Sequence, residues 1–221
     1  MNIKVIFFAV MGLVTMQSGL AITPPVATQS NPFEGAYGQI GVGYETTKIS
    51  GAGGRDGGIP YTVVNQSNDK GLAGTITAGY NFAVRESFVL GVGVEYSPLH
   101  GHKGQLTSGE SRTLSNYSKN SMYNLFLSPG YVINKDGLAY AKVGYSKINE
   151  KFITAGQTDS SNNIGGYSLG VGYKQFIINQ SVYGFGEVNY AKYKDAPDGT
   201  GMTGVHHPDS TNFLMGVGIK F

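Results

Sequence analysis

The sequence contains no cysteine and no tryptophan. The lack of cysteine excludes a disulfide framework and any zinc site with thiolate ligands. Charged residues make up only 14% of the chain, against about 25% in an average soluble domain. The net charge of +2 is too weak and too scattered for a nucleic-acid-binding surface, so no nucleic-acid partner is expected. The mean hydropathy of −0.12 excludes a bundle of transmembrane helices, which needs apolar runs of roughly 20 residues.

The amino terminus has the layout of a secretory signal peptide. Lys4 precedes an apolar run from Val5 to Met16, and Gly19 and Ala21 supply small residues before a cleavage site. This run is too short for a membrane-anchoring helix. We therefore predict that residues 1–21 are a signal peptide. Residues 22–31 contain two prolines and small polar residues without a period, and we predict a disordered lead-in over residues 22–34.

From residue 35 onward, large apolar residues alternate with glycine or polar residues, the pattern of β-strands whose two faces differ. The last segment is the clearest, because Phe213, Met215, Val217, Ile219 and Phe221 all fall on one face. We find eight such segments, near residues 35–47, 71–83, 87–97, 120–132, 138–149, 164–176, 181–193 and 210–221.

The connections between these segments alternate between long and short, beginning with a long one. Such an order is typical of transmembrane β-barrels, which have short periplasmic turns and long extracellular loops. We therefore predict an all-β fold, an eight-stranded antiparallel up-and-down transmembrane β-barrel over residues 35–221. The glycine-rich segment Gly51–Gly58 lies in the first long connection and is expected to form a flexible exposed tip.

The composition of the two faces predicts that the large apolar side chains point outward. The other face is rich in glycine, serine, threonine and asparagine, which suits the narrow interior of an eight-stranded barrel. It also carries three acidic and three basic residues. If these side chains are buried inside the barrel, their charges must be paired with one another. The simpler alternative is that these are ordinary solvated surface charges. The predicted network in the lumen consists of Glu45, Glu95, Glu187, Lys142, Lys174 and Lys220.

Aromatic residues are found at both ends of the apolar face. The separation of Phe88 from Tyr96 corresponds to about 26 Å along a strand, or about 20 Å after a barrel's usual tilt. An outer membrane requires an apolar belt about 25 Å tall between aromatic girdles. The girdle toward the long loops comprises Tyr44, Tyr96, Tyr123, Tyr145, Tyr167, Tyr190 and Phe213. The girdle toward the short turns comprises Tyr80, Phe82, Phe88, Tyr131, Tyr173 and Phe221.

The chain resembles the small eight-stranded outer-membrane barrels of the OmpX and OmpA-transmembrane type, which include porin-family and opacity-protein-like barrels. The resemblance covers residues 35–221 and is carried by segments such as GQIGVGYE (38–45), YSLGVGYK (167–174) and FLMGVGIKF (213–221). It implies a location in the outer membrane of a Gram-negative bacterium, with membrane lipid and lipopolysaccharide as surroundings. It also implies a carboxy-terminal signal for the outer-membrane assembly machinery, made of Phe213, Met215, Val217, Ile219 and Phe221. The peptidoglycan-binding domain of full-length OmpA proteins is not expected.

The sequence offers no catalytic constellation, so neither enzyme activity nor a cofactor is predicted. His100, His102, His206 and His207 fall in the second and fourth long connections. Imidazole groups are suitable ligands for zinc, copper or nickel, but solvated loop histidines are the simpler interpretation.

We expect a structural or surface-interaction role, in which four long extracellular loops contact host or cell-surface ligands. The alternative is a narrow pore for ions or small solutes. A soluble barrel of the lipocalin type that binds a ligand is a third hypothesis, which requires the apolar face to line the interior.

Overall fold

The computed structural model describes residues 31–56, 59–62, 67–99, 102–107, 113–153, 160–194, 196–197 and 205–221. In these ranges the chain consists of β-strands and tight turns. The strands are β1 (Gly35–Asp56), β2 (Ile59–Thr62), β3 (Ser67–Arg85), β4 (Phe88–Leu99), β5 (His102–Thr107), β6 (Thr113–Ile133), β7 (Gly137–Ile153), β8 (Ser160–Ile178), β9 (Val182–Tyr193), β10 (Ala196–Pro197) and β11 (Val205–Lys220). The described residues include no helix long and apolar enough to cross a membrane.

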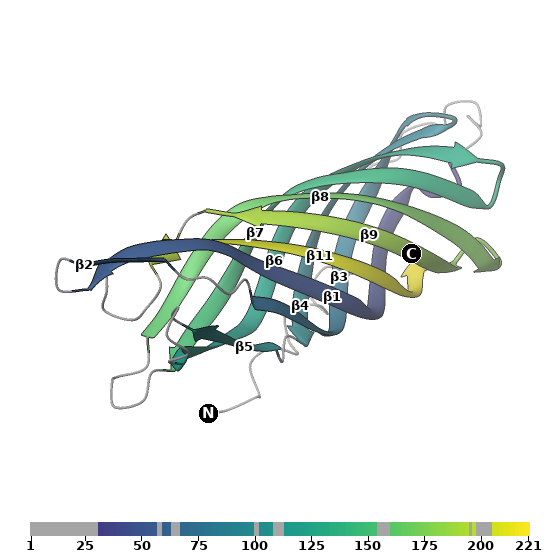
Figure 1. The fold of residues 1–221 in the computed structure, drawn as a ribbon. Helices are drawn as coiled ribbons and strands as arrows, with labels where there is room; N and C mark the ends of the chain where they lie inside the picture. The colour runs from purple at the N-terminus through teal and green to yellow at the C-terminus, as the bar shows by residue number, and fades with distance from the viewer. Residues whose placement is uncertain are drawn as a thin grey trace, which may run out of the picture.

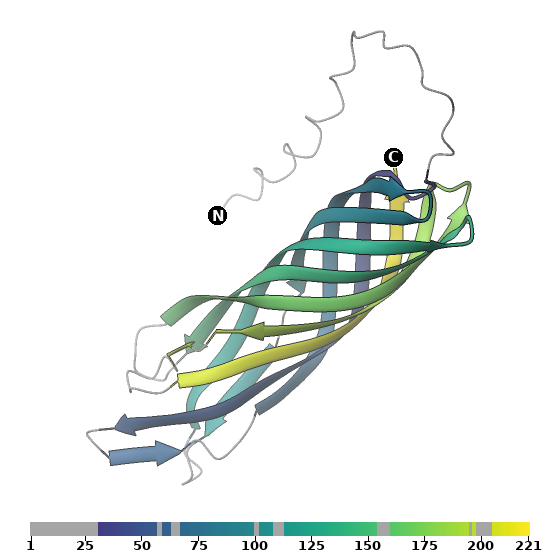
Figure 2. The ribbon, with the colours of Figure 1, turned by 90° about the horizontal axis from the view of Figure 1, so that it is seen from above.

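Eight long strands form a closed antiparallel barrel, which confirms the predicted fold class. Each of β1, β3, β4, β6, β7, β8, β9 and β11 pairs with the next of these strands along the chain. The last strand, β11, also pairs with β1, from Tyr37 opposite Lys220 to Gly53 opposite Val205. This pairing leaves no open edge among the long strands, and they are tilted strongly around the barrel (Figures 1 and 2).

The strand faces are oriented as the alternating pattern predicts. On β11, Phe213, Met215, Val217 and Ile219 are exposed on the outer surface, whereas Leu214 is completely buried. In a membrane protein the outer surface faces lipid, so this arrangement places apolar side chains where hydrocarbon requires them. The soluble alternative, with the large apolar set inside the barrel, does not agree with this orientation.

The strands extend further than the sequence pattern indicates. β1 continues through Gly51 to Asp56, where Gly53 pairs with Thr62 of β2 and Asp56 pairs with Ile59. The prediction of a flexible tip is therefore wrong for Gly51–Asp56, while Gly57 and Gly58 lie outside the described residues. Since β3 begins at Ser67, most of the first predicted loop belongs to strands, and β5 and β10 likewise lie within predicted loops.

The alternating pattern ends before the strands do because it depends on a difference between the two faces. Within the membrane, one face contacts lipid and the other faces the lumen. Beyond the outer girdle the outer face has no lipid to contact and can carry polar side chains. The inner face stays buried at least as far as Met122, Ile148, Ile164 and Tyr193, and the backbone hydrogen-bond ladder continues. Periodicity therefore reports the length of the membrane-facing part of each strand, not the length of the strand.

The described end of the predicted lead-in is ordered, so disorder is the wrong prediction for residues 31–34. The Asn31 side-chain amide donates hydrogen bonds to the backbone carbonyls of Arg85 (3.4 Å) and Glu86 (3.0 Å). The Asn81 amide donates to the carbonyl of Phe33 at 3.0 Å. These contacts attach the segment to the β3–β4 turn and to the barrel wall. Residues 1–30, including the predicted signal peptide, lie outside the described residues.

The short turns lie where the sequence predicts them, and the β8–β9 turn contains two successive residues with positive φ. Asn179 and Gln180 connect β8 to β9 with φ values of 45° and 52°. The Ser181 amide donates to the Ile178 carbonyl at 3.0 Å, closing a tight turn. Two successive positive φ values are typical of the type I′ hairpin turn, which favours Asn-Gly. Here glutamine occupies the position that glycine would take.

Replacing Gln180 with glycine is expected to stabilise the barrel. The substitution removes the steric cost of a left-handed conformation, which exceeds the entropy that glycine adds to the unfolded chain. We expect the free energy of unfolding to rise by about 0.5–1 kcal/mol, measured by urea titration of the refolded protein in lipid vesicles. Ser181→Gly is the control and should lower it, because the positive φ values of this turn are at Asn179 and Gln180.

Candidate functional site

The centre of the lumen contains a buried ion network of three residues. The Lys142 ammonium on β7 lies 2.9 Å from Glu95 Oε2 on β4 and 2.7 Å from Glu187 Oε1 on β9. All three side chains are only 2% exposed. In the order of the barrel, β4 and β9 each lie two strands away from β7, on opposite sides. The network therefore crosses the interior instead of following one pair of neighbouring strands.

Neutral polar groups complete the coordination of the two carboxylates. The Tyr140 hydroxyl donates to Glu187 Oε2 at 2.8 Å, and the Asn189 amide donates to Glu187 Oε1 at 2.6 Å. The Thr77 hydroxyl donates to Glu95 Oε2 at 3.3 Å. Buried ion pairs compensate for lost hydration only when further hydrogen bonds accompany the charge pair. Here both carboxylates have such bonds.

The other three predicted lumen charges do not join this network. The Lys174 ammonium lies among three tyrosine rings, at 3.9, 4.9 and 5.2 Å from the ring centroids of Tyr37, Tyr183 and Tyr140. No carboxylate among the described residues lies within 4.0 Å of it, and the ring faces attract the charge instead.

Glu45 and Lys220 lie closer to the two ends of the barrel. The Glu45 carboxylate is buried and accepts hydrogen bonds from the hydroxyls of Ser210 and Thr47. Lys220 is half-buried, opposite Tyr37 near the short turns. Three of the six predicted residues thus form the central network, whereas Lys174, Glu45 and Lys220 each occupy a separate environment.

Aromatic rings fill the lumen, and each of five rings lies over a glycine on a neighbouring strand. A Cβ atom on any of these glycines would lie closer than 3.0 Å to the ring. Each ring therefore uses the space that the missing side chain leaves, as a narrow barrel interior requires. The paired residues are Tyr37 and Gly79, Phe126 and Gly93, Tyr140 and Gly172, Phe185 and Gly216, and Tyr183 and Gly218.

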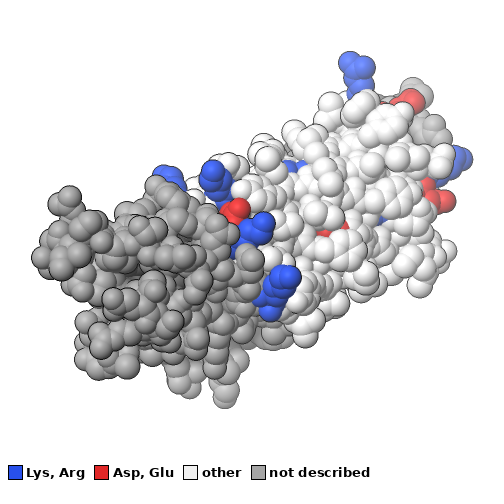
Figure 3. Space-filling view, viewed as in Figure 1, with Lys and Arg blue, Asp and Glu red and all other residues white. Residues whose placement is uncertain are grey.

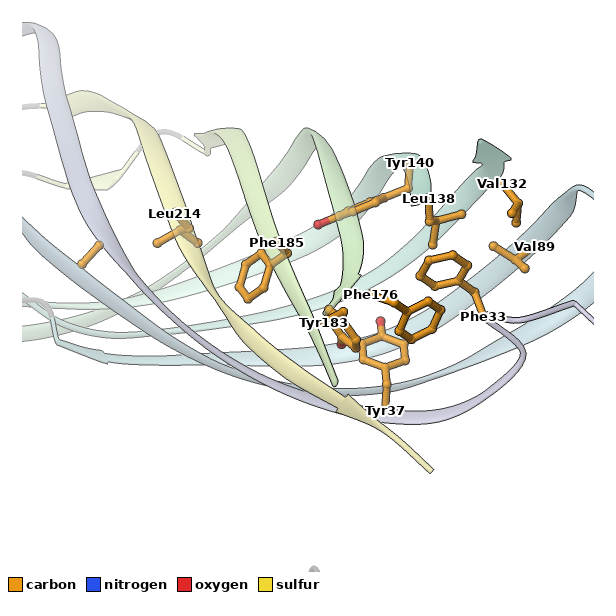
Figure 4. Close-up of a cluster of buried hydrophobic side chains, with 11 residues drawn as sticks. Phe33, Tyr37, Val89, Val132, Leu138, Tyr140, Phe176, Tyr183, Phe185 and Leu214 are labelled. Carbon is orange, nitrogen blue, oxygen red and sulfur yellow. The ribbon is translucent and has the colours of Figure 1, made fainter. Parts of the chain in front are cut away.

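The lead-in segment inserts an aromatic ring into the barrel at the end of the short turns. The Phe33 ring stacks on Phe176 with 4.3 Å between ring centroids, and Phe176 in turn contacts Tyr183 edge-on. Figure 4 shows these three rings grouped with Tyr37 in the same part of the barrel. Phe33 is 2% exposed. Sequence reasoning missed this contact, because a single aromatic residue in a proline-containing segment has no period.

The predicted girdle residues all lie on the outer surface. Contacts within the girdles join neighbouring strands: Tyr96 packs on Tyr123 at 4.9 Å between centroids, and Phe88 packs on Tyr131 at 5.0 Å. Tyr190 is half-buried, and its hydroxyl donates to Asp209 Oδ2 at 3.5 Å. The remaining members, Tyr44, Tyr145, Tyr167, Phe213, Tyr80, Phe82, Tyr173 and Phe221, are exposed.

The five residues of the predicted assembly signal form one apolar stripe along β11. Phe221 is the most exposed of them, at 80%, and its backbone amide donates to the Ala36 carbonyl at 2.9 Å. The stripe therefore ends at the seam where β11 meets β1.

The histidines considered as metal ligands are divided between strands that are not neighbours. His102 lies on β5 opposite Lys119 of β6. His206 and His207 lie on β11, opposite Ala196 of β10 and Ser50 of β1. His100 lies outside the described residues. Among the residues that the structure does describe, no group of three or more histidine and acidic side chains is arranged to hold a metal ion.

Comparisons with known proteins agree with this architecture. A family model described as "Outer membrane protein beta-barrel domain" matches residues 7–221. No curated protein matches the sequence. The similar solved structures include the outer membrane protein OprG from Pseudomonas aeruginosa, with 14% identity, a TM-score of 0.57 and coverage of 85% of this chain and 97% of that one.

Two further structures have lower TM-scores. Neisserial surface protein A has 14% identity and a TM-score of 0.49, with coverage of 85% of this chain and 100% of that one. Ail, the attachment invasion locus protein of Yersinia pestis, has 16% identity and a TM-score of 0.46, with coverage of 85% and 99%. At these identities, the similarity concerns the fold alone.

Replacing Lys142 with methionine is expected to destabilise the barrel strongly. The substitution leaves Glu95 and Glu187 buried without their shared cation, and breaking a buried pair in this way costs about 3–5 kcal/mol. Urea unfolding of the refolded protein would measure the loss.

The triple variant Lys142→Met, Glu95→Gln, Glu187→Gln is the control for this prediction. It removes all three charges together, so most of the lost stability should return. An unchanged stability in Lys142→Met alone would contradict the assignment of a shared cation.

Proposed function

Because this chain belongs to the outer membrane protein β-barrel family and lies in the outer membrane, we propose that it anchors a non-catalytic interaction surface on the cell exterior. In this proposal, residues 1–21 are removed as a signal peptide after export. The apolar stripe from Phe213 to Phe221 is then read by the assembly machinery before β11 pairs with β1. The mature barrel presents its outer part to host or cell-surface ligands.

The observation that carries the proposal is the length of the strands beyond the membrane. A membrane-spanning β-strand needs about 9–11 residues, whereas β1 has 22 residues and β6 has 21. On β1, the part from Glu45 to Asp56 lies beyond the girdle residue Tyr44. We call the strand parts beyond the outer girdle, together with β2, β5 and β10, the extracellular extension. A paired sheet of this length holds contact residues on a firm support, away from lipid.

The filled lumen favours anchoring over transport. The Lys142 network crosses the interior, and rings such as Phe126 and Phe185 occupy the space around it. Phe33 adds a further buried ring at the end of the short turns. An eight-stranded barrel is only wide enough for its own side chains. We assign no catalytic step to the interior, because the described carboxylates at its centre are engaged by Lys142 and its hydrogen-bonding partners.

Shortening the extracellular extension tests the interaction role. Residues 50–66 can be replaced by Asn-Gly, because Ile49 and Ser67 already pair and a two-residue turn can connect them. We expect a Gram-negative strain displaying this variant to adhere several-fold less to an epithelial cell layer than a strain displaying the full chain. Heat-modifiable migration in gels verifies that the shortened barrel folds. Unchanged adhesion after equivalent shortening of all the hairpins would refute the role.

A narrow pore is the alternative function, and the presence of ionisable groups in the lumen favours it as the second candidate. Measurement of current across a planar bilayer separates the two. We expect no steady, size-selective current of porin magnitude from the full chain. Such a current would overturn the anchoring role, and Glu95→Lys would then alter the conductance because Glu95 lies in the central network.

A further inference from the structure

The end of the barrel that carries the short turns has a pocket built from four separate segments. Its volume is about 470 Å³, which lies within the range of small-molecule binding sites. In a barrel of the outer membrane the short turns face the periplasm, so this pocket lies in a different compartment from the extracellular extension. It is lined by Pro32 of the lead-in, Glu86 and Ser87 of the β3–β4 turn, Val132 near the end of β6, Asn134 and Lys135 of the β6–β7 turn, and Gln180 of the β8–β9 turn.

Hydrogen bonds hold the segments around the pocket in place. The Asn31 side-chain amide donates to the Glu86 carbonyl at 3.0 Å, which fixes Pro32 of the lead-in near the β3–β4 turn. The Val132 backbone amide donates to the Ser87 carbonyl at 2.8 Å and joins the same turn to β6. The pocket is therefore a formed part of the fold, as ligand sites usually are.

The lining carries one negative and one positive side chain that no described residue neutralises. Glu86 and Lys135 are exposed on separate turns, and no oppositely charged group of the described residues lies within 4.0 Å of either. The side-chain amides of Asn134 and Gln180 likewise have no hydrogen-bond partner in the described part of the chain. Figure 3 shows charged side chains of both signs at the end of the barrel away from the grey residues, beyond a largely uncharged belt.

Gln180 adopts a backbone conformation that glycine would adopt at lower cost. Its φ is 52°, and the left-handed region is unfavourable for a residue with a Cβ atom. Glycine at this position would stabilise the turn but would remove the side chain from the pocket. A costly backbone conformation that persists at a site is a reason to infer a function there. The glutamine is explained if its amide contacts a ligand.

We propose that this pocket binds a short peptide that carries a free ammonium and a free carboxylate. Glu86 binds the ammonium and Lys135 binds the carboxylate, so each charge of the lining meets its opposite in a charge-assisted hydrogen bond. The amides of Asn134 and Gln180 each offer donors and an acceptor, which match the amide groups of a peptide between the two charges. Val132 provides an apolar contact for a small side chain. The site does not depend on the proposed interaction role, because it lies at the opposite end of the barrel.

Binding of trialanine tests the site. The refolded full chain in uncharged detergent is titrated with trialanine, and isothermal titration calorimetry measures the affinity. We expect N-acetylated trialanine and trialanine amide each to bind about tenfold more weakly, because each lacks one of the two charges. The variants Glu86→Gln and Lys135→Gln should each weaken the binding of trialanine by about the same factor.

Matched controls remove the same charges from outside the pocket. Asp136→Asn and Arg85→Gln change exposed positions on the same two turns that do not line the pocket. Each should change the affinity for trialanine by less than about twofold, because the contribution of exposed charges at a distance is small.

Gln180→Gly separates binding from folding. It should weaken the binding of trialanine about fivefold, which is the worth of one neutral hydrogen bond, while urea unfolding shows a more stable barrel. Asn179→Gly is the control, because it relieves the other positive φ value of the same turn without changing the lining of the pocket. It should leave the affinity unchanged.

Two sources supply such peptides to the periplasm: the peptide stems of the cell-wall polymer, and free peptides. Co-sedimentation of the chain with purified wall polymer, lost in Lys135→Gln, would support the site and identify the stems. Binding of trialanine without co-sedimentation would support the site and identify free peptides. No binding of trialanine, equal binding of its blocked forms, or equal losses in the pocket and control variants would overturn the proposal.

Discussion

The structure depends on one constraint: hydrocarbon supplies no hydrogen-bond partners, so every backbone amide and carbonyl in the membrane must be satisfied by the protein. The pairing of β11 with β1 meets this requirement, because it leaves no open edge among the eight long strands. Outward apolar side chains follow from closure in lipid, and so does the confinement of polar groups to the lumen. Glu95, Glu187 and Lys142 then have only one another and a few neutral partners in place of water.

A narrow closed barrel also restricts what its interior can contain. A large residue on one strand requires a small one beside it, and the pairing of Tyr140 with Gly172 illustrates this rule. The high glycine content thus reflects packing, since these glycines accommodate rings. The same rule explains why Lys174 lies among tyrosines: the rings that fill the lumen also supply the faces that hold its charge.

The sequence predicts those features that depend on the contrast between lipid and lumen. Alternation identifies the membrane-facing part of β11 and the outward direction of Phe213 and Val217, because two unlike solvents act on one strand. It does not reveal the continuation of β1 to Asp56, beyond the lipid-facing part of the strand. The alternation also does not reveal which charged side chains form ion pairs. Glu187 and Lys142 lie on different strands, and the stagger between the strands of the closed barrel brings them together. Nor does the alternation reveal why residue 165 is glycine: the Tyr145 hydroxyl of the neighbouring strand occupies the space that a Cβ atom would need.

The position of Phe33 has a consequence for the order of folding events. The Phe33 carbonyl accepts a hydrogen bond from the side-chain amide of Asn81 on β3. The Phe33 ring stacks on Phe176, which lies near the end of β8. Phe33 precedes every strand in the chain, but it cannot make both contacts until β3 and β8 have taken their places in the barrel. A segment that precedes every strand in the chain must therefore reach its final position late in folding, after the strands that carry its partners have come together.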